Sequence, residues 1–140
     1  MIRLLLDINI VLDVLLRREP HLAASRAVFQ SIERKEAVGY LSAHAFTTIW
    51  YLLRKAGGPA HANARLADLH TVFGVAPVDE SVLVEALALG WVDYEDAVTA
   101  VAARHARCDA IVTRDPRGFV RFTLPVVDAA GAVALLQRGL

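Results

Sequence analysis

Cysteine, lysine and long apolar runs are scarce in this sequence of 140 residues. A single cysteine, Cys108, excludes a disulfide framework and a cysteine-based zinc site, and we expect it to be a buried thiol. Hydrophobic residues make up 56% of the chain, but charges interrupt every apolar stretch well before the roughly 18 residues that a membrane span needs. Asp7 and Asp13 also interrupt any apolar core of a signal peptide. We therefore expect a cytoplasmic protein with no membrane segment.

The charges balance, with 15 Lys and Arg against 15 Asp and Glu, so the net charge indicates no particular partner. A nucleic-acid binder with this balance would need a local basic patch. The length suits one domain, and no repeat, low-complexity tract or linker divides the chain. We expect residues 1–140 to form a single domain, with part of its apolar excess covered by a partner.

Short apolar runs alternate with longer segments of helical spacing, which predicts a three-layer α/β fold with a central parallel sheet flanked by helices. Strands are expected at 2–7, 38–42, 74–78, 110–115 and 125–128. Helices are expected at 9–18, 21–37, 43–56, 61–73, 80–90, 93–109 and 129–139. Ser42 is a candidate cap for the third helix, and Gly57-Gly58-Pro59 is expected to end it.

Acidic residues follow two of the predicted strands. Asp7 ends the first strand and Asp115 ends the fourth, while Asp96 lies in the first turns of the helix before that fourth strand. Functional groups of parallel sheets gather at the carboxyl ends of strands, where the topology switches. Carboxylates gathered there repel one another unless a hard cation lies between them, and Mg²⁺ or Mn²⁺ is the usual one. We therefore expect a metal site that can bind phosphate oxygens and activate a water molecule.

Each of these acids also has a purely structural interpretation. Asp7 would cap the next helix, Asp96 would complement a helix dipole, and Asp115 before a proline is a common turn residue. Asp13 is interpreted as a solvated helix residue or as the partner of Arg17, four positions further on. The arrangement of the first three acids on one sheet edge is what favours a site.

Two stretches resemble the signatures of PIN-domain ribonucleases, in particular the VapC-type toxins of toxin–antitoxin pairs. The first is "LLLDINIVLDVLL", and the second is "DYEDAVTAVAARHARCDAIVTRDPRGF". The resemblance covers nearly the whole chain. It assigns Asp7 and Asp96 as catalytic metal ligands and Asp115 as an auxiliary ligand or water-orienting group. It assigns Asn9 and Thr113 to orienting carboxylates or contacting phosphate.

The resemblance implies Mg²⁺-dependent hydrolysis of RNA phosphodiesters, with Mn²⁺ as the alternative cation. RNA contacts are expected from Arg114 and Arg117, which flank Asp115. The implied partners are an antitoxin protein and a second copy of the chain in a homodimer. The expected dimer surface is the helix around Trp50 with the stretch 60–73.

The sequence departs from the family pattern at one position. The family usually has an acid six residues after the serine that ends the second strand, and that position is Thr48 here. Asp93 or Glu95 is expected to compensate, and Thr47, Thr48 or His44 is a candidate for holding a water molecule near the metal. The alternative function is a catalytically weakened PIN module that binds RNA or a protein partner without cutting.

Two other enzyme classes begin with an acid after an apolar strand. A phosphatase of the haloacid dehalogenase type needs a second acid where this chain has Asn9, and a suitably placed lysine. The only two lysines, Lys35 and Lys55, are badly placed for that role. A receiver domain needs a phosphoacceptor aspartate at the end of a middle strand and a late lysine, and neither is apparent. We therefore favour the nuclease.

Overall fold

Five parallel strands form the centre of the computed structural model, which describes residues 1–119 and 122–139. The strands are β1 Arg3–Leu6, β2 Val38–Ser42, β3 Phe73–Ala76, β4 Ala110–Val112 and β5 Val126–Val127. Their order in the sheet is β3-β2-β1-β4-β5, and every neighbouring pair is parallel. The predicted central parallel sheet is confirmed, and the second strand has the predicted bounds.

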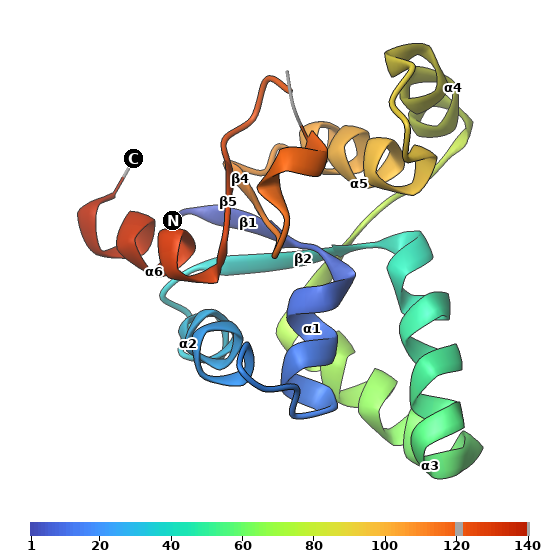
Figure 1. The fold of residues 1–140 in the computed structure, drawn as a ribbon, viewed down its shortest axis with the longest axis vertical. Coiled ribbons are helices and arrows are strands. Elements are labelled where there is room, and N and C mark those ends of the chain that lie inside the picture. The colour runs from blue at the N-terminus through green and yellow to red at the C-terminus, as the bar shows by residue number, and fades with distance from the viewer. Residues whose placement is uncertain (120–121, 140) are drawn as a thin grey trace.

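Helices cover both faces of this sheet (Figure 1). They are α1 Ile8–Leu15, α2 Leu22–Glu33, α3 Ala43–Val72, α4 Glu80–Leu89, α5 Tyr94–His105 and α6 Ala129–Arg138, with a 3₁₀ turn η1 at Pro116–Phe119. In Figure 1, α4 and α5 lie above the sheet, and α1, α2 and α3 lie below it. The predicted three-layer arrangement is therefore confirmed.

The residues of β1 alternate between the two layers. Leu4 and Leu6 pack on one side with α1, α2, α3 and α6, whereas Leu5 packs on the other side with α4 and α5. The alanine-rich face of α5 is fully buried, because small side chains let this helix pack closely on the sheet. Cys108 is buried beside it, as predicted. Each face of the sheet thus has its own apolar core.

The third and fourth predicted helices form one kinked element, α3. Gly58 interrupts it with φ 88° and ψ 172°, outside the helical region, and Pro59 follows. Glycine reaches a positive φ without a steric penalty, so the chain turns here before the second half of α3 leads to β3. The sequence located the break correctly. Ser42 precedes α3, but its buried side chain makes no capping hydrogen bond, contrary to the prediction.

The helices described for residues 1–119 and 122–139 include none that is both long and apolar enough to cross a membrane. Even α3, at 30 residues, carries charged side chains along its exposed side.

Candidate active site

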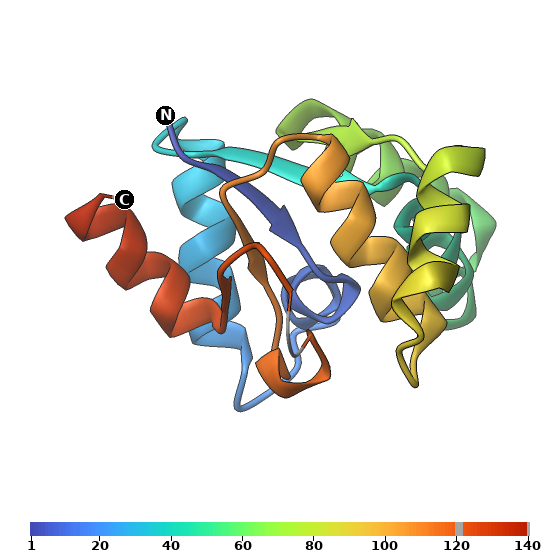
Figure 2. The same cartoon turned by 90° about the horizontal axis from the view of Figure 1, so that it is seen from above.

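The order of the strands creates a switch point between β1 and β4. From β1 the chain proceeds to β2 and β3 on one side, then crosses to β4 and β5 on the other. In parallel sheets the crevice at such a point, outside the carboxyl ends of the strands, is where ligands bind. Asp7 directly follows β1, and Thr113 directly follows β4. Figure 2 shows the start of α1, the start of α5 and η1 along the same edge of the molecule.

Asp7 is held in place by both of its carboxylate oxygens. The backbone N–H of Ile8 donates to Oδ1 at 2.8 Å, so Asp7 is indeed the N-cap of α1. The hydroxyl of Thr113, itself buried, donates to Oδ2 at 2.8 Å. The backbone N–H of Asp7 donates to the carbonyl of Val112 at 2.8 Å and so ties the residue to β4. A carboxylate oxygen can accept more than one hydrogen bond. The bonds from Ile8 and Thr113 therefore leave lone pairs on Asp7 for a ligand.

Asp96 reaches the same edge from α5. Asp93 caps this helix by accepting the backbone N–H of Asp96 at 3.0 Å. The carboxylate of Asp96 lies against η1, because a Cβ atom on Gly118 would be 3.1 Å from Asp96 Oδ2. A larger residue at Gly118 would crowd this oxygen. The turn after β4 and the start of α5 therefore approach each other at the site.

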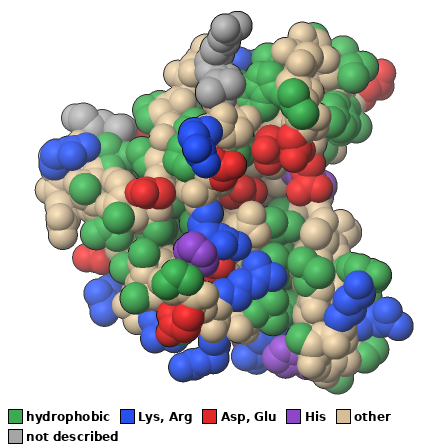
Figure 3. All heavy atoms as spheres, in the orientation of Figure 1, with side chains coloured by type: hydrophobic (Ala, Val, Ile, Leu, Met, Phe, Trp, Pro, Cys, Tyr) green, Lys and Arg blue, Asp and Glu red, His purple; other side chains and the backbone are tan. Residues whose placement is uncertain are grey.

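The acids of this edge repel one another. Burial, followed by the charges of four neighbouring carboxylates, raises the pKa of Asp96 to about 7. The four neighbours are Asp93, Asp7, Glu95 and Asp115, in order of decreasing effect. Burial also raises the pKa of Asp7, although hydrogen bonds from Thr113 and Ile8 act against it. Figure 3 shows acidic side chains gathered in one patch over the region where α1 and α5 begin.

The raised pKa of Asp96, caused first by burial and then by repulsion, predicts how the stability of the metal-free protein depends on pH. The pKa of Asp96 is raised from 3.8 to about 7, so the folded state retains a proton that the unfolded state releases within that range. The free energy of unfolding is thus expected to fall as pH rises from about 4 to 7. Because Asp96 is only half-buried, solvent screening limits its share to about 1–2 kcal/mol.

Urea denaturation between pH 4 and 8 in the presence of EDTA would measure this effect against the Asp96→Asn variant. The variant should be the more stable of the two at pH 8, and the two proteins should converge near pH 4. Parallel curves for the two proteins would contradict the expected clustering of carboxylates.

Two of the supporting residues lie on the elements that flank Asp7. Asn9 is half-buried in the first turn of α1, and Thr48 is half-buried in the second turn of α3. Because α3 begins where β2 ends, the first turn of α3 lies at the carboxyl end of β2, and Thr48 follows in the next turn. The structure thus has no carboxylate at the place where the family pattern has one. Glu95, on the first turn of α5, instead adds its charge to those acting on Asp96.

The prediction for Asp13 was wrong. Its side chain is fully buried and pairs with Arg114, whose Nε lies 3.3 Å from Asp13 Oδ2, while Arg17 lies in the exposed turn after α1. Ser25 of α2 also donates its hydroxyl to Oδ2 at 3.0 Å. Asp13 is one turn after Ile10, so it faces the inside of the protein. The sequence gives no sign of this pair, because its two residues lie far apart along the chain.

The two arginines next to Asp115 differ in their surroundings. Arg114 is tied to Asp13, and 31% of its side chain is exposed. Arg117 is 94% exposed and lies 3.4 Å from Asp115 Oδ1, and such an exposed pair contributes little to stability. Of the two, Arg117 is the freer to reach a ligand at the site.

The donor set suits a divalent cation in its chemistry. Burial and then the charges of neighbouring carboxylates raise the pKa of Asp96, and a bound cation would relieve the repulsion among these carboxylates. Within the part of the chain that the structure describes, no group of three His, Cys, Asp or Glu side chains is close enough to hold an ion as it stands. These side chains therefore have to move toward one another to enclose one. Asp7, Asp96 and Asp115 would hold it, with Asp93 nearby.

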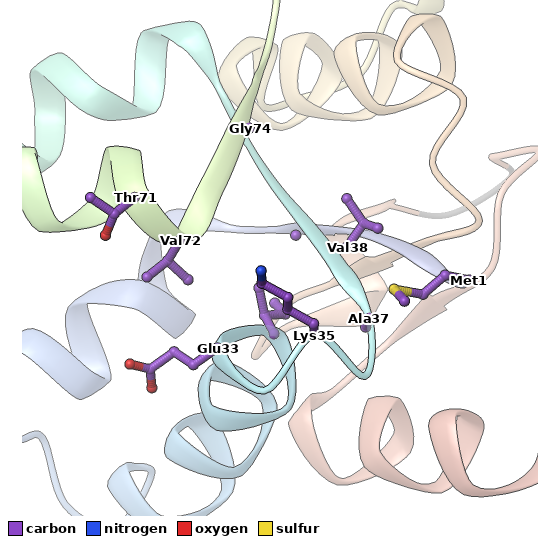
Figure 4. A pocket seen from close by; sticks show the side chains of 10 residues that line it. Met1, Glu33, Lys35, Ala37, Val38, Thr71, Val72 and Gly74 are labelled. Carbon is purple, nitrogen blue, oxygen red and sulfur yellow. The ribbon is translucent and has the colours of Figure 1, made fainter.

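Two of the surface hollows differ in how they relate to the acids. One, of about 400 Å³, opens at the amino ends of β2 and β3, where Met1, Lys35 and Val72 are among its lining residues (Figure 4). It is lined by none of the predicted site residues. The other, of about 680 Å³, adjoins the acids: Asp93, Asp96, Arg117 and Gly118 line it together with Trp91. Sequence reasoning did not find this second hollow, which forms between α5 and η1.

The sequence profile of the PIN domain matches residues 3–117. The chain therefore belongs to the PIN-domain family, as its two signature stretches predicted. A comparison with curated proteins finds no match.

Several solved structures share the fold. VapBC-1 from nontypeable Haemophilus influenzae aligns with a TM-score of 0.70 and 14% identity, covering 92% of this chain and 99% of that one. VapC20 from Mycobacterium tuberculosis, described as a sarcin-ricin loop cleaving toxin, aligns with a TM-score of 0.68 and 18% identity, covering 86% and 96%. VapBC2 from Rickettsia felis, bound to a DNA fragment of its promoter, aligns with a TM-score of 0.66 and 13% identity, covering 91% of this chain and 98% of that one. At these identities the likeness establishes the PIN-like α/β fold.

Proposed function

We propose that this chain is a metal-dependent endoribonuclease and the toxin of a toxin–antitoxin pair, with residues 1–140 forming a single PIN domain. One observation carries the proposal: at the switch point of a PIN fold, the charges of Asp7 after β1 and of Asp115 after β4 act on Asp96 of α5. A structural cap explains Asp7 alone, but it does not explain why Asp96 accepts a position that raises its pKa to about 7. Charge crowding of this kind is typical of functional sites.

The roles that we propose for the residues are those that the family resemblance implies, and their contacts support them. Asp7 is the fixed ligand, because Thr113 and Ile8 hold its two oxygens. Asp96 is the second ligand, and Asp115 is the auxiliary one beside the exposed Arg117. Asn9 and Thr113 would orient carboxylates or contact phosphate.

The cation we propose is Mg²⁺, with Mn²⁺ as the alternative. When bound, it would hold phosphate oxygens and lower the pKa of the attacking water molecule. The protein itself contributes position and charge. Arg117, and the exposed part of Arg114, would bind the RNA backbone on either side of the acids.

Protein partners would cover apolar side chains that α4 leaves in solvent. Leu83, Val84 and Leu87 on this helix are 40%, 60% and 72% exposed, and Val92 follows in the next loop. Such a patch favours a contact with an antitoxin or with a second copy of the chain in a homodimer. Trp50, expected at the dimer surface, donates its indole N–H to Asn63 within α3 at 2.8 Å. We propose that the pair acts in the cytoplasm.

Purified protein incubated with total RNA and with transfer RNA tests this function. Cleavage is expected with Mg²⁺ or Mn²⁺ and not with EDTA. The Thr48→Glu variant adds the carboxylate that the family usually has, so we expect it to raise the cleavage rate at limiting Mg²⁺ about tenfold. The Thr47→Glu variant adds the same charge at the exposed neighbouring position and is the matched control.

A wild-type protein that binds RNA but does not cut it would favour the alternative function, a weakened PIN module. The observation behind that alternative is Thr48 itself. Cleavage by Thr48→Glu alone would identify the chain as a PIN nuclease that has lost most of its turnover. Cleavage that persists in EDTA would contradict a metal-dependent site.

A further inference from the structure

His44 stands at the edge of the sheet where the acids gather. It is the second residue of α3, directly after β2, and β2 is the neighbour of β1. Its ring nitrogen Nδ1 is buried and has no hydrogen-bond partner within residues 1–119 and 122–139. A buried polar atom without a partner costs free energy, so such atoms are rare in native proteins. An unpaired nitrogen at this place therefore requires an explanation.

The neighbours of His44 are the acids of the proposed site. Burial lowers the pKa of His44, whereas the carboxylates of Glu95 and Asp7 act in the opposite direction. The imidazole in turn acts on the carboxylate of Asp7. His44 thus feels the charges of Asp7, which follows β1, and of Glu95 on α5, and it lies four residues before Thr48 on α3. One turn of α3 separates the missing carboxylate from this imidazole.

We infer that His44 replaces that missing carboxylate as a ligand of the cation, with its unpaired Nδ1 as the donor atom. The inference rests on the proposed function, because it concerns the same site. Neutral imidazole is a common ligand of transition metals, whereas Mg²⁺ prefers oxygen. A donor set with one nitrogen is therefore expected to prefer Mn²⁺ over Mg²⁺. This preference should be stronger than that of a donor set made only of carboxylates. His44 is a determinant of which metal the site takes.

Electron paramagnetic resonance of Mn²⁺ bound to the purified protein tests this inference without an activity assay. Electron spin echo envelope modulation is expected to show coupling of Mn²⁺ to a nitrogen nucleus in the wild type. The coupling should be lost in His44→Ala and kept in His61→Ala, an exposed histidine on the second half of the same helix. The Mn²⁺ affinity of His44→Ala should fall about tenfold or more, and its Mg²⁺ affinity, measured by competition, should change much less.

Three results would overturn the inference. They are Mn²⁺ bound without nitrogen coupling, coupling that persists in His44→Ala, and equal losses of Mn²⁺ and Mg²⁺ affinity in that variant. Circular dichroism and thermal melting of each variant establish that it is folded. If Mn²⁺ binds without nitrogen coupling while RNA cleavage still needs the metal, the inference fails and the proposed function stands. If Mn²⁺ does not bind and RNA is not cut, both fail.

Discussion

Replacing Arg114 with methionine is expected to lower the free energy of unfolding by about 3 kcal/mol, the lower end of the range for breaking a buried ion pair. The reason is Asp13, which is fully buried and has Arg114 as its charged partner at 3.3 Å. Ser25 donates one hydrogen bond to Oδ2, but Oδ1 has no partner in the described part of the chain. Without Arg114 a buried carboxylate would lose its counter-charge. Arg114 is itself partly exposed, so the loss should not reach the upper end of that range.

Chemical denaturation of three variants tests this ion pair. Arg117→Met, at a position 94% exposed, is the matched control and should change the free energy of unfolding by less than about 0.5 kcal/mol. The double variant Asp13→Leu/Arg114→Met should recover most of the stability that Arg114→Met loses, because it removes both charges. Equal effects of Arg114→Met and Arg117→Met would contradict the buried pair.

Replacing Asp7 with asparagine is expected to reduce RNA cleavage by at least about a hundredfold while the protein stays folded. Asparagine has nearly the same shape, and its carbonyl oxygen can still accept the N–H of Ile8. Its amide can donate to the hydroxyl oxygen of Thr113, which presently donates to the carboxylate at 2.8 Å. Burial already raises the pKa of Asp7, so removing its charge should not destabilise the fold. What the variant lacks is the negative charge that binds a cation.

Asp109→Asn is the matched control for this experiment. Asp109 precedes β4 and accepts the backbone N–H of Arg3 at 2.8 Å, at the opposite edge of the sheet. Initial rates on the same RNA, with melting temperatures for both variants, separate the loss of a ligand from a loss of structure. If Asp7→Asn cuts RNA as fast as Asp109→Asn does, Asp7 is only the cap of α1.

Local patterns were enough to predict the sheet and the edge that carries the acids. The run at Val38–Ser42 is apolar and rich in residues that favour strands, and it forms β2 with the predicted bounds. The predicted strand at 110–115 was too long, because β4 ends at Val112. The side chain of Thr113, directly after β4, belongs to the candidate site, because its hydroxyl donates a hydrogen bond to Asp7. Because the predicted strands were expected to be parallel, Asp7 and Asp115, which end the first and the fourth of them, were expected at the same edge of the sheet.

Contacts between distant parts of the chain were not predictable in the same way. Asp13 has the spacing of an i,i+4 pair with Arg17, yet the fold places it inside and gives it Arg114 as partner. The close approach of Gly118 to Asp96 depends on how η1 packs on α5. The sequence offered His44 only as a candidate for holding a water molecule, because only the packing shows that its Nδ1 is buried without a partner in the described residues. Sequence patterns indicate periodicity and capping. The ion pair of Asp13, the position of Gly118 and the burial of His44 depend instead on how distant segments pack together.

The switch point also determines when the site comes into existence during synthesis. Asp7 directly follows β1 and is made before Asp96 and Asp115, which belong to α5 and to the turn after β4. A nascent chain that ends before β4 has neither the strand that pairs with β1 nor the Thr113 hydroxyl that holds Asp7. The candidate site would therefore stay incomplete on the ribosome until β4 and the turn after it have been made. For the proposed nuclease, this order would delay activity until that part of the domain has been translated.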